Sequence, residues 1–168
     1  MHPAAKQFCD SVKTARPRYF EPPRKVLDCG SLDINGSNRY LFPGCDYVGL
    51  DVGEGSNVDV VSLMHEYDPG HQFGTIISTE AFEHDLHLQK SMARIVELLE
   101  PGGLFLFTCA STGRLEHGTS RAGKESAPLL EWDHYENVTI DMIDHHFTGF
   151  RERVYHTIGL DLQFWGIK

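Results

Sequence analysis

The sequence lacks the features that mark several large classes of protein. Its 168 residues include 15 Lys and Arg against 24 Asp and Glu, a formal net charge of −9 at pH 7. It has no basic patch or stripe of the kind that nucleic-acid binders carry. No apolar run approaches the length of a membrane span, and residues 1–20 lack the apolar core of a secretory signal. We therefore expect a cytoplasmic protein with neither nucleic acid nor a membrane as a partner.

Cysteine is scarce and scattered. The chain has no CxxC pair, and none of its cysteines has a histidine partner at zinc-site spacing. The four residues are Cys9, Cys29, Cys45 and Cys109. Cys29 and Cys109 lie within apolar runs, so we expect buried, reduced thiols rather than disulfides.

Short apolar stretches alternate with helical patterns along most of the chain. The length and the 40% apolar content fit a single domain over residues 1–168. Strands are predicted at 25–29, 46–52, 58–63, 73–79, 104–110, 151–158 and 161–168. Helices are predicted up to Ala15, over 35–42, within 84–103 (with Asp85 as its cap) and from Thr139 to about Gly149. This order predicts an α/β fold, a Rossmann-like doubly wound and mostly parallel sheet that ends in an antiparallel hairpin.

Two segments interrupt this alternation. Residues 1–23 are expected to form an N-terminal helix and a solvated, proline-rich linker. Residues 111–137 are polar and rich in glycine, and a loop of that length inside a compact domain is usually functional. We expect this second segment to lie on the substrate side.

The loop after the first predicted strand is unsuited to a dinucleotide. The GxGxxG spacing requires glycine at 30, 32 and 35, and the chain has Gly30, Leu32 and Asn35 there. Asp28 and Asp33 flank the turn, where they would repel a pyrophosphate. A ligand that carries positive charge fits this loop better.

Asp51 ends the second predicted strand, 21 residues after Gly30. An acid at this point of a doubly wound sheet reaches the ribose hydroxyls of a bound nucleoside. A ribose without a diphosphate, combined with a cationic group, describes S-adenosylmethionine. Either acid, Asp28 or Asp51, could instead merely cap the helix that follows its strand.

Five stretches occur in the order and spacing of one family. They are "VLDCGS", "YVGLDV", "VDVVSLMHE", "FGTIISTEAFEHD" and "IVELLEPGGLFLFT". Over roughly residues 24–110 the chain resembles the class I S-adenosylmethionine-dependent methyltransferases, in particular the small methyltransferase-domain group with E-H and L-x-P-G-G motifs. The resemblance implies a seven-stranded fold and S-adenosylmethionine as the cofactor, with S-adenosylhomocysteine as its product and no metal.

The resemblance also implies a set of cofactor contacts. Asp28, Gly30 and Ser31 would line the pocket for the methionine part, Asp51 would hold the ribose and Val52 would touch the adenine. Leu63 and Met64 would lie beside the adenine edge, and Thr79 and Glu80 would face the methionine end. The chain departs from the family pattern at Leu32, where a glycine is common, and at Leu63, where an acid is common.

The ten histidines supply candidates on the acceptor side. His134 and Tyr135, at the end of the long loop, are candidates to orient or deprotonate a nucleophile, or else Trp132 and Tyr135 anchor the loop. His84, which matches the E-H motif, and His117 are candidate substrate contacts. His84 and His87 have the spacing of a metal pair, but we expect no metal there.

The predicted function is therefore methyl transfer from S-adenosylmethionine to a small-molecule acceptor. The domain is near the minimum size for its class, so a second copy or a partner chain could cover the substrate side. The alternatives are a non-catalytic methyltransferase-like module that retains the cofactor and, less well supported, an NAD-dependent enzyme.

Overall fold

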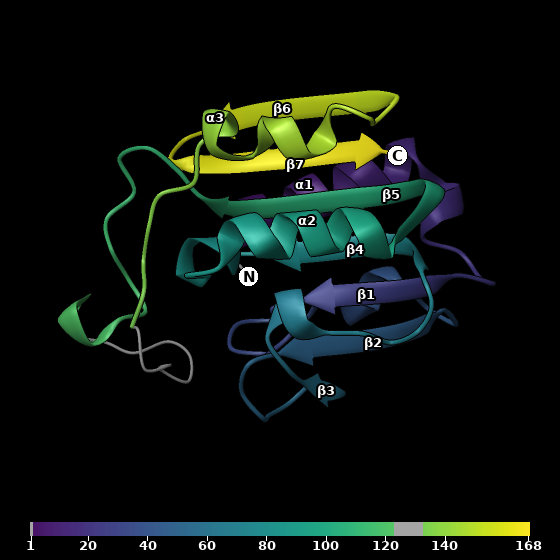
Figure 1. The fold of residues 1–168 in the computed structure, drawn as a ribbon, viewed down its shortest axis with the longest axis horizontal. Coiled ribbons are helices and arrows are strands. Elements are labelled where there is room, and N and C mark those ends of the chain that lie inside the picture. The colour runs from purple at the N-terminus through teal and green to yellow at the C-terminus, as the bar shows by residue number, and fades with distance from the viewer. Residues whose placement is uncertain (1, 123–132) are drawn as a thin grey trace.

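The computed structural model describes residues 2–122 and 133–168 and contains one seven-stranded sheet (Figure 1). The strand order is β3-β2-β1-β4-β5-β7-β6. The strands are β1 (Lys25–Cys29), β2 (Asp46–Asp51), β3 (Val60–Val61), β4 (Phe73–Thr79), β5 (Leu99–Ala110), β6 (Glu152–Ile158) and β7 (Asp161–Ile167). β3, β2, β1, β4 and β5 pair in parallel, whereas β7 pairs antiparallel with both β5 and β6. This arrangement confirms the predicted mostly parallel sheet with its terminal hairpin.

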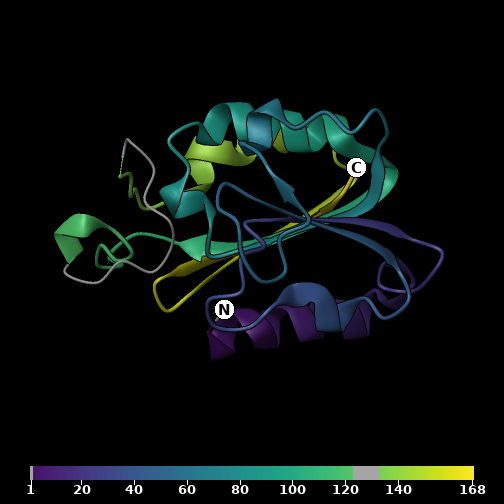
Figure 2. The same ribbon diagram turned by 90° about the horizontal axis from the view of Figure 1, so that it is seen from below.

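Helices cover both faces of the sheet (Figure 2). α1 (Pro3–Ala15) packs on one face, and α2 (Leu88–Leu98) and α3 (Ile140–Ile143) pack on the other. Neighbouring strand residues point to opposite faces, so Ile76 joins the core under α2 and Ile77 joins the core under α1. Burial on both faces explains why "LFLFTCA" is almost entirely apolar.

Several local predictions were wrong in extent. The helix expected at 35–42 is only the 3₁₀-helix η2 (Asn38–Leu41), whose Ser37 Oγ accepts a hydrogen bond from Arg39 N at 3.0 Å. α2 begins at Leu88 rather than near 84, with Asp85 Oδ1 accepting from His87 N. α3 has four residues and continues as the 3₁₀-helix η6 (Asp144–Phe147).

The proline-rich linker is also more ordered than expected. Pro17 begins the 3₁₀-helix η1 (Pro17–Tyr19), and Tyr19 and Phe20 are almost fully buried. Thr75 Oγ1 donates a hydrogen bond to the Tyr19 carbonyl at 2.7 Å. The two aromatic rings belong to the core on the α1 face, so hydrophobic burial fixes a segment whose prolines alone suggested a solvated connection.

The strand order reverses between β1 and β4, and both strands run in the same direction. A crevice therefore opens outside their carboxyl ends, where ligands bind in open α/β sheets. Part of the segment 111–137 extends from this same edge, including the 3₁₀-helix η5 (Ser120–Ala122) (Figure 1). No helix among the described residues is long and apolar enough to cross a membrane.

Candidate functional site

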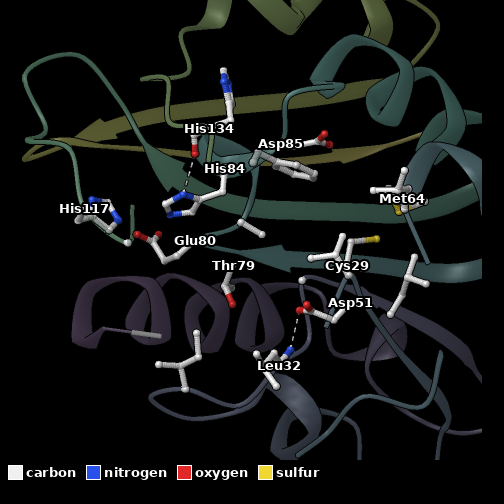
Figure 3. A pocket seen from close by; sticks show the side chains of 18 of the residues that line it. Cys29, Leu32, Asp51, Met64, Thr79, Glu80, His84, Asp85, His117 and His134 are labelled. Atoms are coloured by element: carbon white, nitrogen blue, oxygen red, sulfur yellow. Dashed lines mark hydrogen bonds between the residues drawn. The ribbon is translucent and has the colours of Figure 1, made fainter. Parts of the chain in front are cut away.

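A cavity of about 360 Å³ lies at the carboxyl ends of β1, β2 and β4. Its volume falls in the range of small-molecule sites, roughly 300–1,000 Å³. Of the predicted site residues, those that line it are Gly30, Asp51, Val52, Leu63, Met64, Thr79, Glu80, His84, His117 and His134. Figure 3 shows Asp51 and Met64 at one end, Glu80, His84 and His117 at the other, and Thr79 between them.

Gly30 forms the floor of the turn after β1. Its φ of +80° lies in the left-handed region, which glycine adopts without steric cost. A Cβ atom at this position would lie 2.3 Å from the Ala81 Cβ. The backbone N–H groups of Gly30 and Ser31 both donate to the Leu50 carbonyl, at 2.9 and 3.1 Å. The turn is therefore tied to the end of β2 and leaves a bare backbone facing the cavity.

The Asp51 carboxylate is held by two backbone donors from different loops. Leu32 N donates to Oδ2 at 2.9 Å, drawn as a dashed line in Figure 3, and Gly53 N donates to Oδ1 at 3.1 Å. Each oxygen retains acceptor capacity, because a carboxylate oxygen can accept more than one hydrogen bond. The departure at Leu32 therefore leaves the backbone N–H in use while its side chain lines the cavity.

Asp28 and Ser31 lie beneath the cavity rather than in its lining. The Asp28 carboxyl accepts hydrogen bonds from the Tyr47 hydroxyl and, at 3.1 Å, from Asn38 Nδ2. Asn38 Nδ2 also lies 3.1 Å from Thr79 Oγ1, so this amide links Asp28 to a residue of the lining. Burial raises the pKa of Asp28 to about 6, although both hydrogen bonds oppose that rise.

Glu80 follows β4 in a strained conformation. Its φ is +56°, an arrangement that costs a non-glycine residue about 1–3 kcal/mol and is found mainly at functional sites. Thr108 Oγ1 donates to Oε1 at 2.7 Å, and Glu80 N donates to the Thr108 carbonyl at 2.8 Å. The side chain of Glu80 is thereby fixed in the lining of the cavity.

Two further residues reach this end of the cavity from distant parts of the chain. His2 Nε2 lies 3.1 Å from Glu80 Oε2 and 3.2 Å from Asp161 Oδ2. Arg114 Nη1 lies 2.7 Å from Asp161 Oδ1. Sequence analysis missed His2, Arg114 and Asp161, because no motif surrounds them and only the tertiary fold brings them beside β4.

The end of the cavity next to the 111–137 segment holds a cluster of aromatic and imidazole rings. The ring centroids of His84, His117 and Tyr135 lie 5.0–5.5 Å apart in edge-to-face pairs. Tyr135 does not line the cavity, and its hydroxyl lies 3.0 Å from Asn137 Oδ1 and 3.2 Å from the Leu115 carbonyl. Burial raises the pKa of Tyr135 to about 12, so this hydroxyl stays protonated near neutrality.

His84 and His87, which have the spacing of a metal pair, face different partners. His87 lies against His65, with ring centroids 4.5 Å apart, whereas His84 faces His117. Glu83, whose side chain has no exposed surface, lies instead beside His117, with Oε1 3.8 Å from His117 Nε2.

No protein-family model matches the chain, and no curated protein matches it in sequence. Its fold nevertheless resembles solved methyltransferases. The N-methyltransferase NodS of Bradyrhizobium japonicum WM9, in complex with S-adenosylhomocysteine, is 14% identical over 98% of this chain and 85% of its own, with a TM-score of 0.62. The 1,6-didemethyltoxoflavin-N1-methyltransferase of Burkholderia thailandensis, with bound 1,6-didemethyltoxoflavin and S-adenosylhomocysteine, is 17% identical over 99% and 78%, with a TM-score of 0.66.

A third similar structure acts on carbon rather than nitrogen. The CurJ carbon methyltransferase is 18% identical over 95% of this chain and 53% of its own, with a TM-score of 0.65. At these identities the likeness establishes the fold, and it covers nearly the whole of this chain. The chain has the seven-stranded Rossmann-like fold of the class I S-adenosylmethionine-dependent methyltransferases.

Proposed function

We propose that this chain binds S-adenosylmethionine in the described cavity and transfers its methyl group to a small-molecule acceptor. The observation that carries the proposal is the Asp51 carboxylate, which two backbone N–H groups hold at the cavity end of β2. In a doubly wound sheet an acid at this place accepts the hydroxyl protons of a ribose. The S-adenosylhomocysteine bound to two of the similar structures supports the same ligand here.

The charges around the cavity also favour this ligand over a dinucleotide. Among the described lining residues, carboxyl groups come from Asp51, Glu80, Asp85 and Asp133, and a guanidinium comes from Arg114. A pyrophosphate would be repelled by such a lining, whereas a sulfonium and an ammonium group are attracted. Arg114, beside the cavity's methionine end, is placed to meet a carboxylate.

The proposed contacts divide the cavity into three parts. Asp51 binds the ribose, and Val52, Leu63 and Met64 form the apolar surface against the adenine. Gly30, Thr79 and Glu80 face the amino-acid tail, and Asp28 and Ser31 support this end from below. His134, His84 and His117 lie on the acceptor side, with Tyr135 fixing the loop behind them.

The chemistry is an in-line displacement. The acceptor's lone pair forms a bond to the methyl carbon while the carbon–sulfur bond breaks, and the sulfonium becomes a neutral thioether. Alignment of acceptor, methyl carbon and sulfur can lower the activation barrier by roughly 7–11 kcal/mol at best. An acceptor that holds a proton until attack also needs a general base, and His134 is the candidate. A general base typically raises the rate roughly 10²–10⁴-fold.

Calorimetric titration with S-adenosylhomocysteine tests the binding half of the proposal. Asp51→Ala removes a charged acceptor worth about 1.5–3 kcal/mol, so Kd should rise roughly 10–150-fold. Asp46→Ala, an exposed acid at the opposite end of the same strand, is the matched control and should leave Kd unchanged. Equal affinity of wild type and Asp51→Ala would remove the ribose assignment, and tight NADH binding without binding of S-adenosylhomocysteine would favour a dinucleotide-dependent enzyme.

The catalytic half is tested by release of S-adenosylhomocysteine from S-adenosylmethionine. The protein is incubated with fractions of a small-molecule extract, and the product is quantified by mass spectrometry. Release that depends on one fraction supports methyl transfer to a small molecule. Tight cofactor binding with no release from any fraction supports the non-catalytic module.

A further inference from the structure

Three side chains at the acceptor end of the cavity converge on one point. Glu83, His84 and His117 each offer a ligand atom, and the three atoms all lie within 4.8 Å of one another. Glu83 and His84 belong to the 3₁₀-helix η4 (Phe82–His84), and His117 comes from the 111–137 segment. The fold therefore assembles a 2-His-1-carboxylate set from two segments more than thirty positions apart.

The Glu83 carboxyl lacks an adequate partner among the described residues. The side chain is fully buried, and neither oxygen accepts a hydrogen bond of good geometry. Burial, with the nearby charge of Glu80, raises the pKa of the Glu83 carboxyl to about 8, although the backbone N–H groups of Glu83 and Ala110 oppose that rise. His117 Nε2 at 3.8 Å is too far for a hydrogen bond. A buried carboxyl without partners is costly, which indicates that something else satisfies it.

Both histidines point the same ring nitrogen at a backbone carbonyl. His84 Nδ1 lies 3.3 Å from the His134 carbonyl, drawn as a dashed line in Figure 3, and His117 Nδ1 lies 3.1 Å from the Leu115 carbonyl. A carbonyl can only accept, so each Nδ1 carries a proton, and in the neutral imidazole each Nε2 keeps its lone pair. This is the tautomer and the outer contact that metal-bound histidines commonly show.

A second group with metal-ligating atoms, formed by His2, Glu80 and Asp161, differs in this respect. Glu80 already accepts from Thr108 Oγ1, and Asp161 is paired with Arg114 at 2.7 Å. Its carboxyl groups therefore have donors within the protein. The orphaned carboxyl and the two free Nε2 atoms occur together only in the Glu83 group, as far as the described residues go.

We propose that Glu83, His84 and His117 bind a Zn²⁺ ion. Two imidazole nitrogens and one carboxylate oxygen are a ligand set of catalytic zinc sites, which keep a fourth position open. His84 and His117 both line the cavity, so the open position faces the space where an acceptor would lie. The ion site goes beyond the proposed function. The further step, in which the ion polarises an oxygen or nitrogen of the acceptor, rests on the proposed function.

Binding of zinc itself is the test, on untagged full-length protein freed of metal by dialysis against a chelator. Calorimetry with ZnCl₂ should give one ion per chain, and Co²⁺ should give the visible absorption of a tetrahedral N/O site. Glu83→Gln and His117→Ala should each weaken binding at least about tenfold. His156→Ala, an exposed histidine on β6, is the matched control and should not change binding.

His117 is partly exposed, so its variant keeps the test valid if Glu83→Gln fails to fold. Absence of saturable zinc binding, or equal binding by wild type and His117→Ala, overturns the proposal. Loss of binding in His2→Ala with retention in His117→Ala assigns the ion to the other group and overturns it equally. S-adenosylhomocysteine titrations on the same samples separate the two proposals, because zinc binding without cofactor binding refutes only the proposed function.

Discussion

Asp28→Asn is expected to change the pH dependence of stability. Asp28 is 1% exposed, and its carboxyl meets the Tyr47 hydroxyl and Asn38 Nδ2. Burial, with a smaller contribution from the charge of Asp51, raises its pKa to about 6. An aspartate in an unfolded chain has a pKa of about 3.9. Asparagine keeps the shape of the side chain and removes the titration.

The direction in which the free energy of unfolding changes with pH follows from proton binding. Between about pH 4 and pH 6 the folded chain holds a proton on Asp28 that the unfolded chain has lost, so the free energy of unfolding falls as pH rises. The contribution of Asp28 is most favourable below pH 4 and is fully lost above pH 6. The gap between the two pKa values corresponds to about 3 kcal/mol. The Asp28→Asn variant has no such loss, so its stability gains on that of the wild type across this window.

The assay is urea unfolding followed by circular dichroism at a series of pH values from 4 to 7.5, without ligand. The free energy of unfolding of Asp28→Asn minus that of the wild type should increase by about 2 kcal/mol between pH 4 and pH 7, which is most of the full difference. Asp46→Asn, an exposed acid on β2, is the control and should show a far smaller change. A difference that stays constant with pH would refute the raised pKa, and one that falls with pH would show that the fold stabilises the ionised carboxylate instead.

Two further predictions concern the cavity. Gly30→Ala should abolish most binding of S-adenosylhomocysteine, because the new Cβ would meet the Ala81 Cβ at 2.3 Å and the φ of Gly30 is +80°. Gly70→Ala is the control, because Gly70 has a similar φ of +71° but open space around the new Cβ. This variant has the backbone strain without the clash and should leave affinity intact. Calorimetry and thermal melts on both variants check this, and equal losses in the two would show that the clash is irrelevant. His134→Ala should slow release of S-adenosylhomocysteine at least about tenfold while leaving the Kd of S-adenosylhomocysteine unchanged, because His134 lines the cavity at its proposed acceptor side. Unaltered release, measured by mass spectrometry, would leave His134 with a structural role.

Local sequence patterns predict much of the fold. Central strands such as Phe73–Thr79 and Leu99–Ala110 are rich in buried apolar residues because a parallel sheet is covered on both faces. Gly30 and Asp51 could be recognised from their spacing, since the turn after β1 and the tip of β2 meet at one edge in every sheet of this order. Local patterns predicted the lengths of the elements less well. Within residues 35–42 only a short 3₁₀-helix forms, and burial of Tyr19 and Phe20 orders the proline-rich linker.

Local sequence patterns were enough to predict the α/β class, the edge of the sheet that holds the cavity and most of the residues at the strand tips, because these follow from periodicity and from position relative to each strand. Only the folded structure shows which residues from distant parts of the chain lie together at that edge. The fold brings His2, Arg114 and Asp161 to Glu80, and it sets His117 beside Glu83 and His84. It also turns Asp28 away from the cavity toward Tyr47. Such contacts join residues far apart in the chain, and their geometry depends on packing that no local pattern records.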